Sequence, residues 1–200
     1  MDSRLIALGL SYLVGSFPTA YVLVKTLKRA DIRTIGSGNV GSTNVTRAAG
    51  FKAGLVVFLA DALKGVVAVK LIAPRWFLGD STMAILCGAF AVIGHVAPVW
   101  LQFKGGKGVA TTIGVLSSAM PFVAMICLVA WWVVFLLWRY VSLASLAAMA
   151  VMPVAQWAMR QPPAQVLIGA GLSALIFVKH HANILRLLSG TEDRWKSKKG

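Results

Sequence analysis

Hydrophobic residues gather along the chain in seven runs, which short polar or glycine-rich segments separate. A helix needs about 20 residues to cross the roughly 30 Å hydrocarbon core of a bilayer. Four runs have that length or nearly so, Val109–Ser118 is too short to cross unaided, and the last two are short. The pattern predicts an all-α integral membrane protein. The runs are Arg4–Val24, Phe51–Ala73, Ser81–Trp100, Val109–Ser118, Pro121–Trp138, Leu143–Met159 and Ala164–Lys179.

The composition supports a membrane location. Apolar residues make up 58% of the chain and charged residues only 13%, against about 45–50% and 25% in soluble domains. The net charge of +14 could indicate nucleic-acid binding, but the charges lie in short loops between apolar runs. Anionic headgroups, a positive-inside bias and anionic substrates explain it better. Cys87 and Cys127 lie in apolar runs, so we expect small buried hydrophobes rather than disulfide or metal ligands.

The basic residues predict an orientation. Fifteen of the twenty Lys and Arg residues fall in Lys25–Lys52, after Trp100, at Arg139 and from Lys179 onward. The segments predicted on the other side of the membrane hold only three Lys or Arg residues. Cytoplasmic loops of membrane proteins are enriched in Lys and Arg. We therefore expect the N-terminus outside, as a retained helix rather than a signal peptide, and the C-terminus in the cytoplasm.

Lys104 and Arg139 share the cytoplasmic side only if the chain between them enters the membrane and returns. Residues 109–138 as one helix would extend about 45 Å, too long for a straight crossing. Ser117, Ser118 and Pro121 supply a break. The prediction is a hairpin with one short limb, giving seven transmembrane helices in a single domain, residues 1–200. All unusual polar stretches then reach the cytoplasmic face.

The first such stretch is "GSGNVGSTNVTRAAG". Its glycines allow positive φ angles, and successive backbone N–H groups in such a loop can surround an anion. Hydroxyl and amide side chains add donors, and Arg47 can bind a phosphate through two N–H groups. The alternative is a flexible polar loop before a helix. The motif is neither a P-loop nor GxGxxG, so no nucleotide is predicted. The candidate residues are Gly36, Ser37, Gly38, Asn39, Gly41, Thr43, Asn44 and Arg47.

The second stretch is "FKGGKGVATTIG". Lys104 and Lys107 flank Gly105 and Gly106, and Gly108 follows. A short helix is predicted to begin nearby, so its N-terminal dipole adds positive potential at the same point. Lysines that extend to the membrane surface are the alternative, but they do not require three glycines. We expect phosphate binding.

The third stretch is "KHHANILRLLSGTE". His180, Asn183 and Arg186 recur at spacings of three and share one helical face. His181 points elsewhere. Glu192 is the only glutamate in the chain.

Other polar residues are candidates as well. Asp61 and Lys64 are three residues apart inside a span, either lining a cavity or forming a structural pair. His95 ends the third run and could join the same region or lie at the interface. Ser142 and Ser145 share a helical face near Arg139. No GxSxG or metal-type carboxylate cluster occurs, and the few acids make a conventional general base hard to supply. The site is suited to binding anions and stabilising developing negative charge.

Taken together, these stretches resemble the bacterial acyl-phosphate–glycerol-3-phosphate acyltransferases, the PlsY family. "GSGNVGSTN", "GHVAPVWLQFKGGKGVAT" and "KHHANILRLLSGTE" correspond in order, spacing and character, and "DALKG" and "RYVSLAS" are further shared stretches. Ser42, His181 and Ala182 depart from the usual pattern.

The resemblance implies a seven-helix enzyme of the bacterial inner membrane with a cytoplasmic active site. It would transfer a fatty acyl group from acyl phosphate, not acyl-CoA, to the sn-1 hydroxyl of glycerol 3-phosphate. The products would be lysophosphatidic acid and inorganic phosphate, in the first step of phospholipid synthesis. We expect no cofactor, metal or nucleic-acid partner. A small transporter of phosphate esters and a structural assembly factor are the alternatives.

Specific roles follow from this chemistry as hypotheses. Ser37, Asn39, Thr43, Asn44 and Arg47 would hold one phosphate; Lys104, Lys107 and the adjacent glycines would hold the other. His180, Asn183, Ser142 and Ser145 would complete the pocket, with Asp61 and Lys64 as further candidates for substrate binding. The attacking hydroxyl would pass its proton to a substrate phosphate, and His180 as general base is the alternative. Acyl-chain length, oligomeric state and which cluster binds which phosphate stay open.

Overall fold

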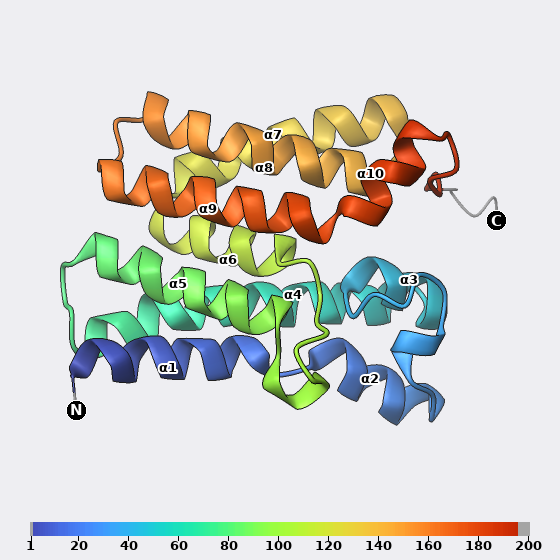
Figure 1. Ribbon diagram of the computed structural model, residues 1–200, viewed down its shortest axis with the longest axis horizontal. Helices are drawn as coiled ribbons and strands as arrows, with labels where there is room; N and C mark the ends of the chain where they lie inside the picture. Colours follow the sequence, from blue (N-terminus) through green and yellow to red (C-terminus); the bar gives the residue numbers. More distant parts are fainter. Residues whose placement is uncertain (1, 196–200) are drawn as a thin grey trace. The chain divides into compact units, whose positions relative to one another are not determined.

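The computed structural model describes residues 2–195, in which all regular structure is helical (Figure 1). The chain forms two compact units, Met1–Met120 and Pro121–Gly200. The single domain expected from the sequence stays a prediction.

The first unit begins with a broken helix. α1 (Ser3–Ser16) and α2 (Thr19–Lys28) together replace the single run expected over Arg4–Val24. Pro18 causes the break, because proline lacks an N–H group and its ring clashes with the carbonyl four residues earlier. The signal was visible in the sequence "SFPT", inside the apolar run.

The remaining helices of the first unit pack closely around small residues. α1 contacts α5, and α4 contacts α3 and α6. Gly15 meets the backbone of Ala91, and Gly114 meets that of Ala62, so neither position has room for a Cβ atom. Small residues at helix contacts are typical of membrane proteins. The elements are η1 (Ile32–Thr34), α3 (Ser42–Ala49), α4 (Phe51–Val67), η2 (Ala68–Ile72), η3 (Ala73–Arg75), α5 (Ser81–Val96), η4 (Val99–Leu101) and α6 (Val109–Ala119).

The second unit contains four helices. α7 (Pro121–Trp138) and α9 (Pro163–Lys179) both pack against α8 (Val141–Ala158). α10 (His181–Leu188) follows α9 after a bend of 61°. α6 ends at Ala119 and α7 begins at Pro121, so the chain breaks where the sequence indicated.

The helices fit a multi-pass membrane protein. Within residues 2–195, four helices are long and apolar enough to cross a bilayer if α1 and α2 count together as Ser3–Lys28, or five if the bent pair α9 and α10 also counts as one span. α6 is apolar but short. Large apolar side chains remain exposed in stripes, for example Leu55, Leu59 and Leu63 on α4 at 43%, 57% and 56%, as expected for surfaces in contact with lipid. A helix lies in each predicted run, while seven crossings and the orientation of the termini stay predictions.

Candidate active site

The first glycine loop, residues 35–41, is built around the side chain of Asn44. Asn44 is 1% exposed. Its Oδ1 accepts from the backbone N–H of Ser37 at 3.1 Å, and its Nδ2 donates to the carbonyls of Ile35 at 2.9 Å and Asn39 at 3.1 Å. A Cβ on Gly36, which has φ +58°, would collide with Asn44 Oδ1. The residue expected to bind a phosphate therefore shapes the loop that could do so.

Several other candidates lie around this loop with more exposure. Ser37 and Arg47 are exposed, and Asn39 and Thr43 are half-buried. Gly41 is the N-cap of α3 and offers no side-chain cap, so the first N–H groups of that helix have no capping side chain. Hydroxyl, amide and backbone donors thus lie at the start of α3, and Arg47 is in the last turn of the same short helix.

The second glycine loop, residues 102–108, is tied to the end of α5. The N–H groups of Gly105 and Gly106 donate to the carbonyls of Val96 at 3.2 Å and His95 at 3.1 Å. The Lys104 N–H donates to Leu101 at 3.1 Å. The backbone amides of Gly105 and Gly106, expected to hold a phosphate, are therefore used by the fold.

The start of α6 offers donors next to this loop. Gly108 is its N-cap with φ +89° and no side-chain cap. The first turn of an α-helix has backbone N–H groups without intrahelical partners, and the helix dipole favours an anion there. Lys104 is exposed and Lys107 is half-buried. The cationic groups and the helix start thus remain together, as the sequence predicted.

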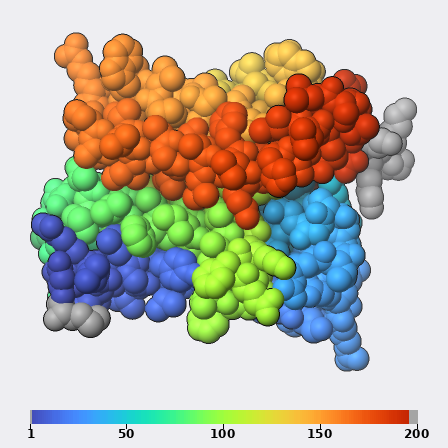
Figure 2. Space-filling model, in the orientation of Figure 1, coloured from blue at the N-terminus to red at the C-terminus, as the bar shows by residue number. Residues whose placement is uncertain are grey.

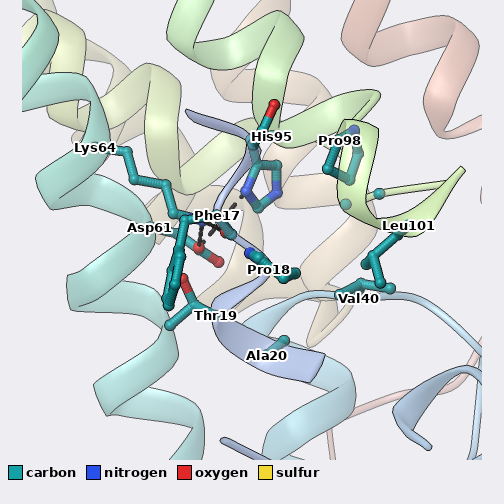
Figure 3. Close-up of a pocket in the computed structure, with 13 residues that line it drawn as sticks. Phe17, Pro18, Thr19, Ala20, Val40, Asp61, Lys64, His95, Pro98 and Leu101 are labelled. Atoms are coloured by element: carbon teal, nitrogen blue, oxygen red, sulfur yellow. Dashed lines mark hydrogen bonds and ion pairs between the residues drawn. The ribbon is translucent and has the colours of Figure 1, made fainter. Parts of the chain in front are cut away.

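A buried charged cluster lies beneath these loops in the first unit (Figure 3). Lys64 Nζ donates to Asp61 Oδ1 at 2.6 Å and to the Phe17 carbonyl at 2.6 Å. His95 Nδ1 is 3.6 Å from the same oxygen of Asp61. Asp61 and Lys64 thus form a buried ion pair that also bonds to the carbonyl at the helix break, and both residues line a pocket as well.

The two glycine loops meet at this cluster. Val40, Gly105 and Gly106 line one pocket together with Asp61, Lys64 and His95. In Figures 1 and 2 the yellow-green segment around residue 100 lies beside the blue segment of α2. The structure thus brings the first two polar stretches together within the first unit.

Glu192 organises the third stretch in the second unit. Its Oε1 accepts from Ser142 Oγ at 2.6 Å and from Asn183 Nδ2 at 2.7 Å, and its Oε2 from Arg186 Nε at 2.7 Å. Asn183 and Arg186 therefore share a face, as predicted. Sequence reasoning noted Glu192 as the lone glutamate but gave it no role, because a glutamate in a polar loop usually faces water.

The environment of Glu192 keeps it ionised. Burial alone would raise the pKa of its carboxyl, but hydrogen bonds from Ser142, Asn183 and Arg186 outweigh that effect and lower the pKa below its ordinary value. A carboxylate that accepts several hydrogen bonds favours its charged form. Glu192 thus orients three donors rather than serving as a proton acceptor.

His180 lies at the bend between α9 and α10 and is 3% exposed. Its Nδ1 lies 2.8 Å from the carbonyl of Ile176. Since a carbonyl can only accept, Nδ1 carries a proton in this contact. Ser145 has other partners: its hydroxyl donates to Val141 and accepts from Trp131. Ser142 thus donates a hydrogen bond to Glu192, whereas Ser145 links α8 to Trp131 of α7.

Cys87 and Cys127 are buried free thiols, as predicted. No group of His, Cys, Asp and Glu residues suited to a metal occurs within residues 2–195.

Comparison with known proteins shows the family. A sequence model described as glycerol-3-phosphate acyltransferase matches residues 5–190. The chain belongs to the glycerol-3-phosphate acyltransferase family. A relative of that name from Syntrophotalea carbinolica is 41% identical over 197 residues, covering 98% of this chain and all of the relative. A second relative of that name, from Sinorhizobium medicae, is 44% identical over 194 residues, covering 97% of this chain and 93% of the relative.

Two solved structures of the acyltransferase family are also similar. Both are of PlsY (YgiH), an integral membrane glycerol 3-phosphate acyltransferase. Its glycerol 3-phosphate form aligns with a TM-score of 0.91 and 42% identity, covering 98% of this chain and 96% of that one. Its lysophosphatidic acid form aligns with a TM-score of 0.88 and 40% identity, again covering 98% of this chain and 96% of that one. The resemblance to the PlsY family is confirmed.

Proposed function

We propose that the protein transfers a fatty acyl group from acyl phosphate to the sn-1 hydroxyl of glycerol 3-phosphate. Lysophosphatidic acid and inorganic phosphate are released. The reaction takes place at the cytoplasmic face of the bacterial inner membrane. Family membership supports glycerol 3-phosphate as the acceptor, because the related PlsY was crystallised in a glycerol 3-phosphate form and in a lysophosphatidic acid form.

The observation that supports the choice of donor is that five of the six carboxylates are held in structural contacts. Asp2 and Asp80 cap helices, Asp31 pairs with Arg33, and Asp61 pairs with Lys64. Glu192 accepts from three donors. Carboxylates held in this way are poor candidates for a general base. An acyl phosphate suits such a site, since this mixed anhydride is already activated and carries a good leaving group.

The donor side chains divide into two phosphate sites. Ser37, Asn39, Thr43 and Arg47 surround one phosphate, positioned by Asn44. Lys104, Lys107 and the first turn of α6 bind the other, which replaces the role first expected for Gly105 and Gly106. Two phosphates repel each other, so the cations lower the cost of bringing the reactants together.

In the second unit, Glu192 holds Asn183 and Ser142. Asn183 donates an amide hydrogen to Glu192 at 2.7 Å. Asn183 and His180 contact the substrates as well. The attacking hydroxyl passes its proton to a substrate phosphate, so positioning supplies most of the acceleration.

The direct test is acyl transfer by the purified protein in detergent. Labelled glycerol 3-phosphate is supplied with acyl phosphate or with acyl-CoA in parallel. The proposal predicts labelled lysophosphatidic acid and phosphate release with acyl phosphate only. Equal transfer from acyl-CoA would contradict the proposed donor. Absence of lysolipid in detergent, together with uptake of label into sealed vesicles, would favour the transporter.

A further inference from the structure

A continuous series of contacts connects the helix break with the second glycine loop. Lys64 holds the Phe17 carbonyl and Asp61, and Asp61 faces Nδ1 of His95. All three side chains are buried, at 6%, 2% and 8% exposure for Lys64, Asp61 and His95. Burying charged groups is costly unless each has a partner, so this arrangement fixes the position of the imidazole.

The other edge of His95 contacts Gly106. A Cβ atom on Gly106 would collide with His95 Nε2 and would lie 2.9 Å from the Val40 carbonyl of the first glycine loop. Gly106 also donates its N–H to the carbonyl of His95 at 3.1 Å. The imidazole and the backbone of His95 therefore hold Gly106 against the first glycine loop.

A small pocket, lined by polar and apolar residues, lies beside this contact. It lies between residues 16–19 of the helix break and Gly105 and Gly106, and in Figure 3 His95 stands between Asp61 and Pro98. Ser16 Oγ and Thr19 Oγ1 are buried there without a hydrogen-bond partner. Gly106 therefore depends on His95 and Val40 for support on this side.

We infer that His95 is a positioning residue for the second glycine loop. Held by Asp61, it sets the place of Gly106 and hence of Lys107 and the α6 start relative to the first glycine loop. It does not touch the reacting atoms. Since it acts on a phosphate-binding loop, it controls the affinity for the phosphate-bearing substrate held there, glycerol 3-phosphate or acyl phosphate, rather than the rate of the chemical step; that this loop binds a phosphate rests on the proposed function.

The test is a double-mutant cycle with a matched control. His95→Ala and Gly106→Ala are made singly and together, and kcat and the KM values for glycerol 3-phosphate and for acyl phosphate are measured. Each single change is expected to raise one of these KM values about tenfold and to change kcat less than about twofold. The double variant should be clearly less impaired than the product of the two single effects, because the collision with the imidazole is gone while the close contact with the Val40 carbonyl remains.

Gly105→Ala is the control. Its Cβ would collide with the His95 carbonyl and with Pro98, and His95→Ala removes neither. The effects of Gly105→Ala and His95→Ala are therefore expected to multiply. His95→Gln, which reaches nearly as far as the imidazole, should recover part of the affinity and serves if the alanine variant does not fold.

The inference is overturned if the effects of His95→Ala and Gly106→Ala multiply like those of the control, or if His95→Ala lowers kcat at unchanged KM. A wild-type protein without acyl transfer would contradict the proposed function instead. In that case the same cycle is measured as the shift in unfolding temperature caused by glycerol 3-phosphate or inorganic phosphate. Coupling between His95 and Gly106, and none between His95 and Gly105, remains the expected result.

Discussion

Asn183 Nδ2 lies 2.7 Å from Glu192 Oε1, so the segment after α10 turns back onto the helix that precedes it. The same oxygen accepts from Ser142 of α8. Glu192 therefore joins the last helix, its following loop and α8 into one unit. The side chains expected to contact substrate in the second unit depend on this carboxylate for their orientation.

Glu192→Gln should weaken both folding and activity. The variant keeps one oxygen but turns an N–H group toward Arg186, so the charged hydrogen bond at 2.7 Å is lost. We expect a loss of about 1–3 kcal/mol in the free energy of unfolding, measured by thermal unfolding in detergent. Asp193→Asn, an exposed neighbour, is the control and should change stability less.

The pH dependence of the unfolding free energy tests whether ionised Glu192 stabilises the folded protein. Its pKa lies below the ordinary 4.5 in the folded protein, so protonation favours the unfolded state. The stabilisation is complete above pH 4.5 and is lost as the pH falls through the folded-state pKa. The difference in unfolding free energy between the wild type and Glu192→Gln should therefore shrink in acid. A constant difference between them from pH 7 down to acid would disprove this.

Asn44→Ala should impair catalysis without removing any group that contacts substrate. It deletes the bonds from Asn44 to Ser37, Ile35 and Asn39, so the first glycine loop loses its defined shape. Misplacing binding groups by about 1 Å can cost roughly 100-fold in rate, and a similar fall in kcat/KM is expected. Asn44→Asp keeps the acceptor for Ser37 but not the two donors, and should be nearly as impaired. Wild-type activity in both variants would show that the loop does not need this support.

Arg47→Ala and Lys104→Ala should each remove a cation from a phosphate site. Loss of one preorganised donor typically costs ~2–4 kcal/mol of transition-state stabilisation, measured here as kcat/KM with both substrates. Lys52→Ala, which removes an exposed charge at the start of α4, is the control and should have little effect. Near-full activity in either test variant would remove that residue from the site.

His180→Ala separates the two candidate bases. With a substrate phosphate as proton acceptor, the variant is slower but keeps the shape of the wild-type pH–rate profile. Loss of one titrating group from the profile in His180→Ala, but not in Lys104→Ala, would instead identify His180 Nε2 as the base.

Helix positions could be predicted because lipid imposes a strong pattern. Runs such as Pro121–Trp138 contain no charge, and α7 has the same bounds. The three polar stretches were also recognisable, since clustered glycines, hydroxyls and lysines contrast with an apolar background. That contrast, however, does not show which donors the fold itself uses.

The missed features depend on tertiary contacts. Nothing local to Gly105 and Gly106 indicates that their N–H groups bond to the end of α5. The role of Asn44 depends on a turn that brings Ile35 back to α3. Glu192 acquires its role only because Ser142, fifty residues earlier, lies beside it. The break at Pro18 was the exception, because proline within an apolar run is a local signal.

Sidedness tests the account most directly, because the proposed site requires all three polar stretches at the cytoplasmic face. Single cysteines at the exposed positions Thr34, Phe103 and His181, in a chain with Cys87 and Cys127 replaced by serine, are labelled with a membrane-impermeant thiol reagent in oriented vesicles. We predict that all three react only from the cytoplasmic side. Labelling of any one from the opposite side would contradict a shared site and, with it, the proposed reaction.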